Sequence, residues 1–384
     1  MTRRLELGTF GVRMAFGACV LACSPVLVQA QAGEPALRGI TVGPIESSQQ
    51  PGRGYGTAYS AELLDELVRL GANAISITPF GRIWSLQSTE ILFDFEAPYP
   101  ENRAAIGEMI AQAKARGLRV LLIPHLWVET GGWRGEIDPG SEEGWLRYQD
   151  AYRRFVLAWA KDAQRYGADA FSIGVECKSW SGRFGGYWSG LIAELRSVFA
   201  GRLTYSANWD EAEDVAFWDQ LDWVGVNAFY PLAHADNASD EEYRRNAELA
   251  LERLRELSES VQKPVVMVEI GYTTRANAAV QPWLWPDTMQ NVIVDEREQA
   301  RALAALAGAA ASHEFVRGLF VWRYYSNLDD VSQEAIWGFS PHGKLAEPVL
   351  ERIFGLPWAA DPVRPPWEPV PLAPRDRWPE RLWE

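Results

Sequence analysis

Eight short apolar segments alternate with helical segments along this chain, and no other feature of the sequence constrains the fold as strongly. The apolar segments occupy residues 37–43, 72–80, 118–127, 169–178, 202–209, 221–231, 263–274 and 316–325. Several contain β-branched runs without polar alternation, which is typical of parallel strands buried on both faces. Eight such strands alternating with helices predict an α/β fold, a single-domain (β/α)8 TIM barrel over residues 37–355.

The boundaries of the helical segments favour the same architecture. Ser60, Ser141 and Ser239 can each cap a helix, the last in a capping box with Glu242. Helix-to-strand connections are short and often contain Gly, whereas strand-to-helix connections are mostly long and rich in Trp, Tyr, Arg and Glu. This asymmetry predicts functional groups at the carboxyl-terminal end of the barrel. A doubly wound sheet is the alternative, but the GxGxxG turn expected after its first strand is missing.

The first thirty residues have the features of an export signal. Basic residues precede an apolar stretch over 14–28 that is too short to span a membrane. The sequence Val28-Gln29-Ala30 predicts signal-peptidase cleavage, with a mature chain that begins at Gln31 and is periplasmic or secreted. The alternative is a lipoprotein signal that ends at residue 22, with a lipid anchor on Cys23.

Composition excludes several partners. A net charge of −14 makes nucleic acid and anionic membrane surfaces poor partners. The four histidines form neither HxH nor HExxH, so we expect no metal site, and nothing indicates a cofactor. Residues 356–384 form a tail rich in Pro and Trp, which we expect to wrap the barrel without regular structure or to be partly disordered.

Two carboxylates end apolar strands in the same way. Glu269 follows four apolar residues in KPVVMVEIGYTT (263–274), and Glu176 ends a similar run in DAFSIGVECK (169–178). A carboxylate at the end of a buried strand costs desolvation free energy unless a partner or a reaction uses it. One such Glu could equally be a salt-bridged structural residue. A matched pair on strands four and seven predicts two carboxylates that face one cleft.

A pair of carboxylates across a cleft suits glycoside hydrolysis. A retaining glycosidase uses one as nucleophile and the other as acid/base, with the carboxyl groups about 5–5.5 Å apart. We expect Glu269, which lies deeper in its strand, to attack the anomeric carbon. We expect Glu176 to protonate the leaving oxygen and then to activate water.

The stretches SIGVECKS and VMVEIGYTT resemble the acid/base and nucleophile strands of glycoside hydrolase family 113. The resemblance spans about 37–354 and includes WGFSPHGK near the carboxyl terminus. It implies a retaining enzyme of the large clan whose catalytic glutamates lie on strands four and seven, with Glu176 as acid/base, Glu269 as nucleophile and β-1,4-mannan as the substrate class. In the broader clan the acid/base often follows an Asn that binds the sugar 2-hydroxyl. Here Val175 precedes Glu176. Family 113 also tends to lack that Asn, so the departure fits the family, and the partner of the 2-hydroxyl is not identified.

Other side chains near strand ends are candidates for substrate binding. Trp322 ends strand eight, where the clan usually places a Trp floor under the cleaved sugar. Tyr230, after Asn227 on strand six, could donate a hydrogen bond to Glu269 and hold it ionised. His125 on strand three could orient hydroxyl groups; for each of these, a packed residue at the barrel rim is the alternative. Weaker candidates for sugar subsites are Arg82, Trp84, Trp127, Trp209 and Trp283.

The sequence thus predicts an exported retaining glycoside hydrolase, with endo-β-1,4-mannanase as the first hypothesis. A glycosidase for another β-glycan, such as a glucan, a xylan or an exopolysaccharide, is the second, because the choice between epimers depends on a few hydroxyl contacts. A barrel that binds glycans without cleaving them is the third.

Overall fold

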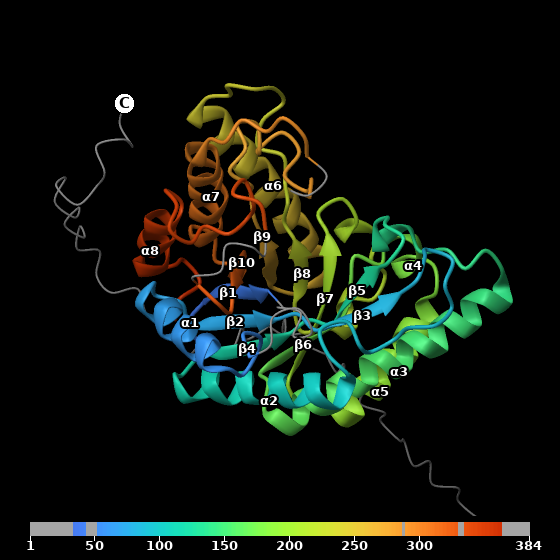
Figure 1. Cartoon of the computed structure of the whole chain (residues 1–384). Helices are drawn as coiled ribbons and strands as arrows, with labels where there is room; N and C mark the ends of the chain where they lie inside the picture. The colour runs from blue at the N-terminus through green and yellow to red at the C-terminus, as the bar shows by residue number, and fades with distance from the viewer. Residues whose placement is uncertain (1–33, 44–51, 286–288, 329–333, 363–384) are drawn as a thin grey trace, which may run out of the picture. The chain divides into compact units, whose positions relative to one another are not determined.

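The computed structural model describes residues 34–43, 52–285, 289–328 and 334–362. The predicted leader, with Gln31 and Cys23, and the last part of the tail lie outside these ranges. The barrel strands are β1 (Leu37–Gly43), β2 (Ala74–Ile77), β4 (Arg119–Leu122), β6 (Ala170–Val175), β7 (Arg202–Asn208), β8 (Val224–Asn227), β9 (Val265–Ile270) and β10 (Val316–Tyr325). They close in the order β1-β10-β9-β8-β7-β6-β4-β2, all neighbours parallel, which confirms the predicted barrel (Figure 1).

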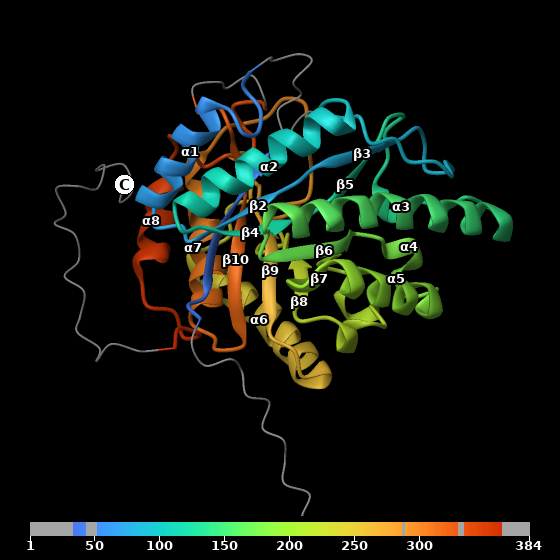
Figure 2. The same cartoon turned by 90° about the horizontal axis from the view of Figure 1, so that it is seen from below.

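Helices surround the barrel on its outer side, as Figure 2 shows from below. They are α1 (Ala58–Arg69), α2 (Tyr99–Ala115), α3 (Glu142–Tyr166), α4 (Lys178–Ser181), α5 (Gly185–Val198), α6 (Asp240–Val261), α7 (Glu296–Ala311) and α8 (Glu347–Gly355). Between β7 and β8 the described chain forms only two short 3₁₀ turns, Ala212–Asp214 and Trp218–Gln220. No helix within the described ranges combines the length and the apolar character needed to cross a bilayer.

Side-chain caps start the helices largely where the sequence indicates. Ser141 accepts a hydrogen bond from the backbone of Gly144 at the start of α3, and Ser239 does the same at the start of α6. The predicted cap of α1 at Ser60 is three residues too late, because Thr57 is the cap and accepts from the backbone of Ser60. A threonine hydroxyl serves this purpose as a serine hydroxyl does.

Two of the predicted strands are each divided in the structure. Segment 72–80 becomes β2 and a further strand, β3 (Phe80–Ile83), while 118–127 becomes β4 and β5 (His125–Val128). Pro79 and Pro124 stand at the two breaks, where a residue without an N–H cannot donate to the barrel ladder. The strands β3 and β5 then pair with each other as a separate parallel sheet. His125 is therefore the first residue of β5, beyond the end of the barrel strand on which it was predicted.

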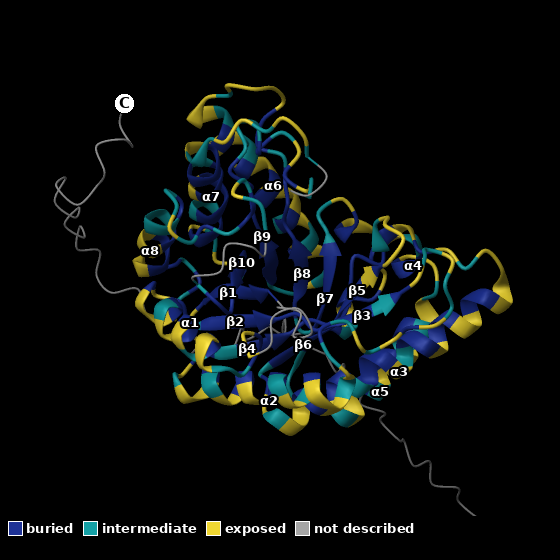
Figure 3. Ribbon diagram, in the orientation of Figure 1, coloured by how far each residue is buried: buried dark blue, intermediate teal, exposed yellow. Residues whose placement is uncertain are grey.

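Two layers of apolar side chains hold the barrel together. The inner layer comes from strands around the whole ring and consists of Leu37, Ala74, Leu121, Ile123, Ala170, Val175, Trp223, Val266, Val268 and Phe320. A larger cluster lies between the strands and the helices. Figure 3 shows the barrel strands largely buried and the outward faces of the helices exposed. The described start of the tail also packs onto this body, because Trp358 is buried and Asp361 pairs with Arg38 at 2.7 Å.

Candidate active site

Glu176 leaves the barrel in an unusual backbone conformation. It follows the last residue of β6, its N–H donates to the carbonyl oxygen of Ser206 at 2.8 Å, and its φ is 50°. A non-glycine residue in the left-handed region costs about 1–3 kcal/mol and needs support from its surroundings. The N–H of Cys177, the next residue, provides such support by donating to the hydroxyl of Tyr205 at 2.6 Å. The carboxyl group of Glu176 thereby lies at the mouth of the barrel.

Glu269 reaches the same mouth through an irregularity in β9. Val268 belongs to the interior layer, so strict alternation would turn the next side chain outwards. In the pairing with β8, Asn227 lies opposite Glu269, whereas the residue before Asn227 lies opposite Met267. Val268 is therefore the extra residue of a β-bulge, a feature that redirects side chains next to active sites. As a result Glu269 is directed into the barrel, with 4% of its surface exposed.

The amide of Asn227 lies beside both carboxyl groups. Its Nδ2 donates to Oε1 of Glu176 at 3.0 Å, and Asn227 lies opposite Glu269 in the pairing of β8 with β9. The other oxygen of Glu176, Oε2, accepts from Nε1 of Trp133 at 2.7 Å and lies 3.8 Å from Nη1 of Arg134. Both oxygens of Glu176 thus accept N–H groups, and the two glutamates from strands four and seven share one site.

His125 lies between Arg134 and Glu269 and contacts both. Nη1 of Arg134 contacts Nδ1 of His125 at 2.9 Å, and because a guanidinium only donates, Nδ1 accepts and the ring proton resides on Nε2. Burial lowers the pKa of His125 well below its usual value, and the charges of Arg134 and Arg323 act in the same direction, so the ring is neutral. Nε2 lies 3.2 Å from Oε1 of Glu269. That contact lacks hydrogen-bond geometry, and neither atom has another hydrogen-bonding partner among the described residues.

Opposing charges act on Glu269. Burial raises its pKa well above the usual value, and the carboxylate of Glu176 adds to this effect. The guanidinium groups of Arg134 and Arg323, with the amide of Asn227, act the other way. The balance favours the protonated form of Glu269 in the resting protein, and the two arginines limit the free energy needed to ionise it.

Aromatic rings form one wall of the site. The indole of Trp322 on β10 lies nearly parallel to the imidazole of His125, with 5.8 Å between ring centroids. Trp322 belongs to a buried cluster with Phe229 and Phe339, against which Trp209 and Trp285 pack. Farther out, Trp209 stacks on Trp283 with 5.4 Å between centroids, and 43% of Trp283 is exposed. Flat indole faces of this kind suit the apolar faces of sugar rings.

Tyr230 packs against this aromatic wall. It is buried, no hydrogen bond joins it to Glu269 among the described residues, and its ring meets Trp209 edge-on at 5.8 Å. The charged groups that act on its hydroxyl belong to Arg253 and Glu213, outside the barrel mouth. No hydrogen bond among the described residues supports the prediction that Tyr230 holds Glu269 ionised, and that role stays a prediction. Arg134, Arg323 and Asn227 favour the ionised form.

Three further candidates lie on the sheet formed by β3 and β5 or directly after it. Arg82 pairs at 3.1 Å with Glu129, the residue directly after β5. Trp127 packs against Phe95 with 5.5 Å between centroids. Trp84 and Trp127 are 67% and 40% exposed. Among the described contacts, none of these side chains touches the two glutamates, and their role as subsite residues stays a prediction.

Several residues near the glutamates were not predicted from the sequence. Trp133 and Arg134 belong to the loop after β5, and Arg323 lies next to Trp322 with its guanidinium 4.7 Å from the indole centroid. An arginine within an apolar strand segment, such as Arg323 in 316–325, is a signal that the sequence offers. Charged residues are rarely buried unless they are paired, so such an arginine points to a partner. The loop residues carry no comparable local pattern.

A third buried carboxylate lies behind Glu176. Glu211 is 1% exposed, accepts from the hydroxyl of Tyr205, and accepts from the N–H of Asn208 at 3.1 Å. Burial raises the pKa of Glu211 to about 7, and the charge of Glu176 contributes. Since Tyr205 also receives the N–H of Cys177, Glu211 supports the backbone that presents Glu176.

The described residues include no group of three or more His, Cys, Asp or Glu side chains that could hold a metal ion. Several reactive and polar groups converge at the site. These are two neighbouring carboxyl groups, neutral imidazole and amide donors, two guanidinium groups and an aromatic wall.

Comparison with known proteins gives a consistent result. The sequence model of Glycoside Hydrolase Family 113 matches residues 48–344. A structure described as a complex of a family 113 β-1,4-mannanase has 24% identity and a TM-score of 0.72, covering 84% of this chain and 99% of that one. The family 113 β-mannanase of Alicyclobacillus acidocaldarius, in complex with ManMIm, has 25% identity and a TM-score of 0.71, covering 84% and 97%.

A more distant likeness extends to other glycosidases. The β-glucuronidase of Faecalibacterium prausnitzii shares the fold at 15% identity and a TM-score of 0.55, with 85% of this chain and 50% of that chain covered. No curated protein sequence matches the chain.

Proposed function

The chain belongs to glycoside hydrolase family 113, and on this premise we propose that it is an endo-β-1,4-mannanase that cleaves with retention of configuration. The observation that carries the proposal is that Glu176 and Glu269 lie at one site, where Asn227 donates to Glu176 and lies opposite Glu269 in the strand pairing, and where the charge of Glu176 acts on Glu269. Two carboxyl groups at one site are what a double displacement requires.

In the first step, a carboxylate oxygen of Glu269 attacks the anomeric carbon and the glycosidic bond breaks. Glu176 gives its proton to the departing oxygen, so the leaving sugar departs as an alcohol and a covalent glycosyl-enzyme remains. In the second step, Glu176 takes a proton from water, the water oxygen attacks the same carbon, and Glu269 leaves as a carboxylate. Each step inverts the carbon, and the product keeps the β configuration.

The location of one proton decides whether this mechanism can operate. In the resting site, Glu176 accepts two N–H groups while burial favours protonated Glu269. The mechanism requires the reverse, an ionised Glu269 and a protonated Glu176, when substrate is bound. Arg134 and Arg323 stabilise the ionised nucleophile, and so does the positive charge that develops at the anomeric carbon.

The substrate class rests on the family and on aromatic surface. The solved structures with 24% and 25% identity are described as β-1,4-mannanase and β-mannanase. Trp322, Trp209 and Trp283 provide indole faces for successive sugar rings. Because mannan, glucan and xylan share such faces and differ in hydroxyl positions, a different β-glycan is the competing substrate.

A polysaccharide panel tests the proposal. Wild-type protein and Glu269→Gln should be incubated with mannan, glucan and xylan, and the release of reducing ends and the sizes of the products measured. We expect wild type to release short β-1,4-manno-oligosaccharides and the variant to release none. Activity on glucan or xylan without activity on mannan would replace the substrate class. Equal activity of the variant would contradict the role of Glu269.

We also propose that the protein is exported, with cleavage after Ala30, on the strength of the basic and apolar leader. Mass spectrometry of the mature protein from periplasm or medium should find Gln31 at the amino terminus. Recovery from the membrane fraction with a lipid on Cys23 would establish the lipoprotein alternative.

A further inference from the structure

The small sheet of β3 and β5 has one face that packs onto the body of the protein. Its two strands pair without a register shift and lie side by side beyond the ends of β2 and β4 (Figure 2). Ile83, Leu126 and Val128 belong to the core, and at Gly81 a side chain would meet the ring of Phe155 in α3. The residues that alternate with these along each strand therefore lie on the other face, which we call the outer face.

The outer face carries three rows of paired side chains. The rows are Phe80 with His125, Arg82 with Trp127, and Trp84 with Glu129. The third row lies just past the ends of the strands, where the N–H of Glu129 still donates to the carbonyl oxygen of Ile83 at 2.9 Å. His125 is buried, whereas Trp127 and Trp84 are exposed. The outer face thus leads from the interior of the mouth to the surface.

The first row belongs to the active site. Nε2 of His125 lies 3.2 Å from Oε1 of Glu269. Ring contacts continue outwards from there, because the centroid of Phe80 lies 4.9 Å from that of His125 and 6.5 Å from that of Trp127. A polymer that places one sugar at Glu269 can therefore continue over the same face.

The second and third rows combine flat rings with polar groups. Phe95 packs against Trp127 with 5.5 Å between centroids, and its ring centroid lies 5.3 Å from the guanidinium of Arg82. Arg82 in turn pairs with Glu129 at 3.1 Å. Indole faces suit the apolar faces of sugar rings, while a guanidinium donates to hydroxyl groups and a carboxylate accepts from them.

The length of the outer face matches a chain of sugars. At about 3.3 Å per residue, the stretch from His125 to Glu129 extends about 13 Å, which is longer than one sugar ring. A ligand that filled only the space beside Glu269 would leave Trp127 and Trp84 without a contact.

We propose that the outer face of the β3–β5 sheet binds the substrate chain beyond the cleaved linkage. Trp127 and Trp84 stack on successive sugars, and Arg82 and Glu129 bind their hydroxyl groups. The occupant is the glycan that the proposed function cleaves, so this site rests on that function. Its consequence is a preference for long chains over short ones.

Kinetics on a long and a short substrate test the proposal. We would measure kcat/KM with mannohexaose and with an aryl β-mannoside, which has a single sugar. In Trp127→Ala and in Trp84→Ala, the ratio of the first value to the second should fall roughly three- to tenfold, as expected for the loss of one stacked ring. Arg82→Gln should lower the same ratio. An unchanged ratio in both tryptophan variants would overturn the proposal.

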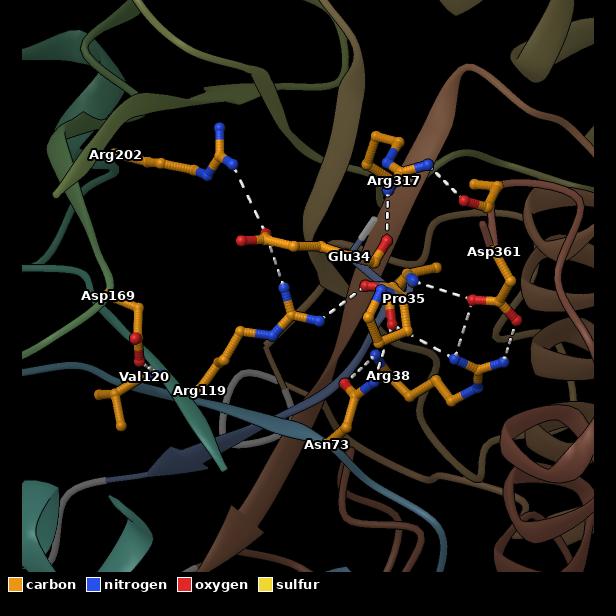
Figure 4. Close-up of polar contacts among 12 residues, drawn as sticks. Glu34, Pro35, Arg38, Asn73, Arg119, Val120, Asp169, Arg202, Arg317 and Asp361 are labelled. Carbon is orange, nitrogen blue, oxygen red and sulfur yellow. Dashed lines mark hydrogen bonds and ion pairs between the residues drawn. The ribbon is translucent and has the colours of Figure 1, made fainter. Parts of the chain in front are cut away.

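Arg119→Gln is the matched control for Arg82→Gln. Arg119, the first residue of β4, pairs with Glu34 at 3.1 Å at the amino-terminal end of the barrel (Figure 4). This pair has the same length as the pair in the outer face. The ratio should keep its wild-type value in the control. Circular dichroism melts show whether each variant is folded, and Trp84→Ala removes little packing because Trp84 is exposed.

A binding measurement separates this site from the proposed function. Calorimetric titration of Glu269→Gln with mannohexaose measures affinity without cleavage, and adding Trp127→Ala should weaken the affinity roughly three- to tenfold. Cleavage of mannan by wild type, with equal affinities in the two variants, would refute the site and leave the proposed function intact. Weaker binding in the double variant, without cleavage of mannan by wild type, would refute the function alone.

The oligomeric state distinguishes a glycan from a second copy of the chain as the occupant. Analytical ultracentrifugation should give the same mass for wild type and Trp127→Ala. If Trp127→Ala dissociates an oligomer and leaves the affinity for mannohexaose unchanged, the outer face is a contact between copies of the chain and the proposal fails. If the protein neither cleaves mannan nor binds mannohexaose, the site and the proposed function both fail.

Discussion

Replacing Glu269 with Gln should stabilise the fold at neutral pH while abolishing hydrolysis. Glu269 is 4% exposed, and burial together with the charge of Glu176 raises its pKa well above the ordinary 4.5. A raised pKa means that the folded protein binds this proton more tightly than the unfolded chain does. The resulting stabilisation is complete below the unfolded pKa and is lost as the pH rises through the folded pKa. Gln keeps the shape of the protonated acid and cannot lose a proton.

The size of the effect follows from proton linkage. Between the two pKa values, wild type should lose about 1.4 kcal/mol of unfolding free energy per pH unit relative to Glu269→Gln. At about 2.1 cal/mol/K of unfolding entropy per residue, 1 kcal/mol corresponds to roughly 1.5 °C in Tm for the described part of the chain. The two melting curves should therefore separate by about 2 °C per pH unit, starting near pH 4.5.

Thermal melts followed by circular dichroism between pH 4 and pH 8 measure this separation. Glu129→Gln is a control, because Glu129 is an exposed carboxylate paired with Arg82 at 3.1 Å near the same mouth. Its Tm should show no such divergence from wild type. In Glu176→Gln the pH range over which Glu269 lowers the stability should be narrower and end at a lower pH, because one of the two causes of the raised pKa is removed. Parallel curves for wild type and Glu269→Gln, or a less stable variant at pH 7, would refute this reasoning.

Three further predictions concern Glu176 and its supports. In Glu176→Ala, azide should restore turnover of an activated aryl β-glycoside and yield a β-glycosyl azide, because azide attacks the glycosyl-enzyme without a base. If azide instead rescues Glu269→Ala and yields an α-glycosyl azide, the roles of nucleophile and acid/base are reversed. Trp133→Phe removes the indole N–H that donates to Glu176 at 2.7 Å, a hydrogen bond worth about 1.5–3 kcal/mol. The value of kcat/KM should therefore fall roughly 10- to 150-fold. Unchanged kinetics would show that this hydrogen bond does not contribute to catalysis. Tyr205→Phe leaves the N–H of Cys177 unpaired, so urea denaturation should show a loss of about 1–3 kcal/mol in the free energy of unfolding. Because this N–H supports the backbone that presents Glu176, kcat should fall more than KM changes. A loss of stability with unaltered kcat would make the role of the tyrosine purely structural.

Local patterns were sufficient to predict the barrel. Eight apolar runs separated by capped helices can bury their surfaces in few ways, and the caps at Ser141 and Ser239 lie where the sequence places them. Pro79 and Pro124 also carried the information that two strands would divide, since a residue without an N–H interrupts a ladder. The positions of Glu176 and Glu269 on strands four and seven follow from the same counting of strands.

The neighbours of the two glutamates could not be read in this way. Arg134 approaches from a loop and Arg323 from β10, and neither is near Glu269 in sequence. Tyr230 follows β8 as a mouth residue would, but its ring packs edge-on against Trp209, and no hydrogen bond joins it to Glu269 among the described residues. Which way a side chain points after a strand ends depends on packing between segments far apart in the chain.

The sequence by itself determined the order of strands and helices and the strand that carries each glutamate, because hydrophobic periodicity and capping act over a few residues. Only the tertiary structure decided where those carboxyl groups point. The bulge at Val268 exists because β9 pairs with β8, and the positive φ of Glu176 is supported through Tyr205 of a neighbouring strand. Both features change the direction of a side chain through contacts between strands, and local propensity does not encode contacts that form only when the barrel closes.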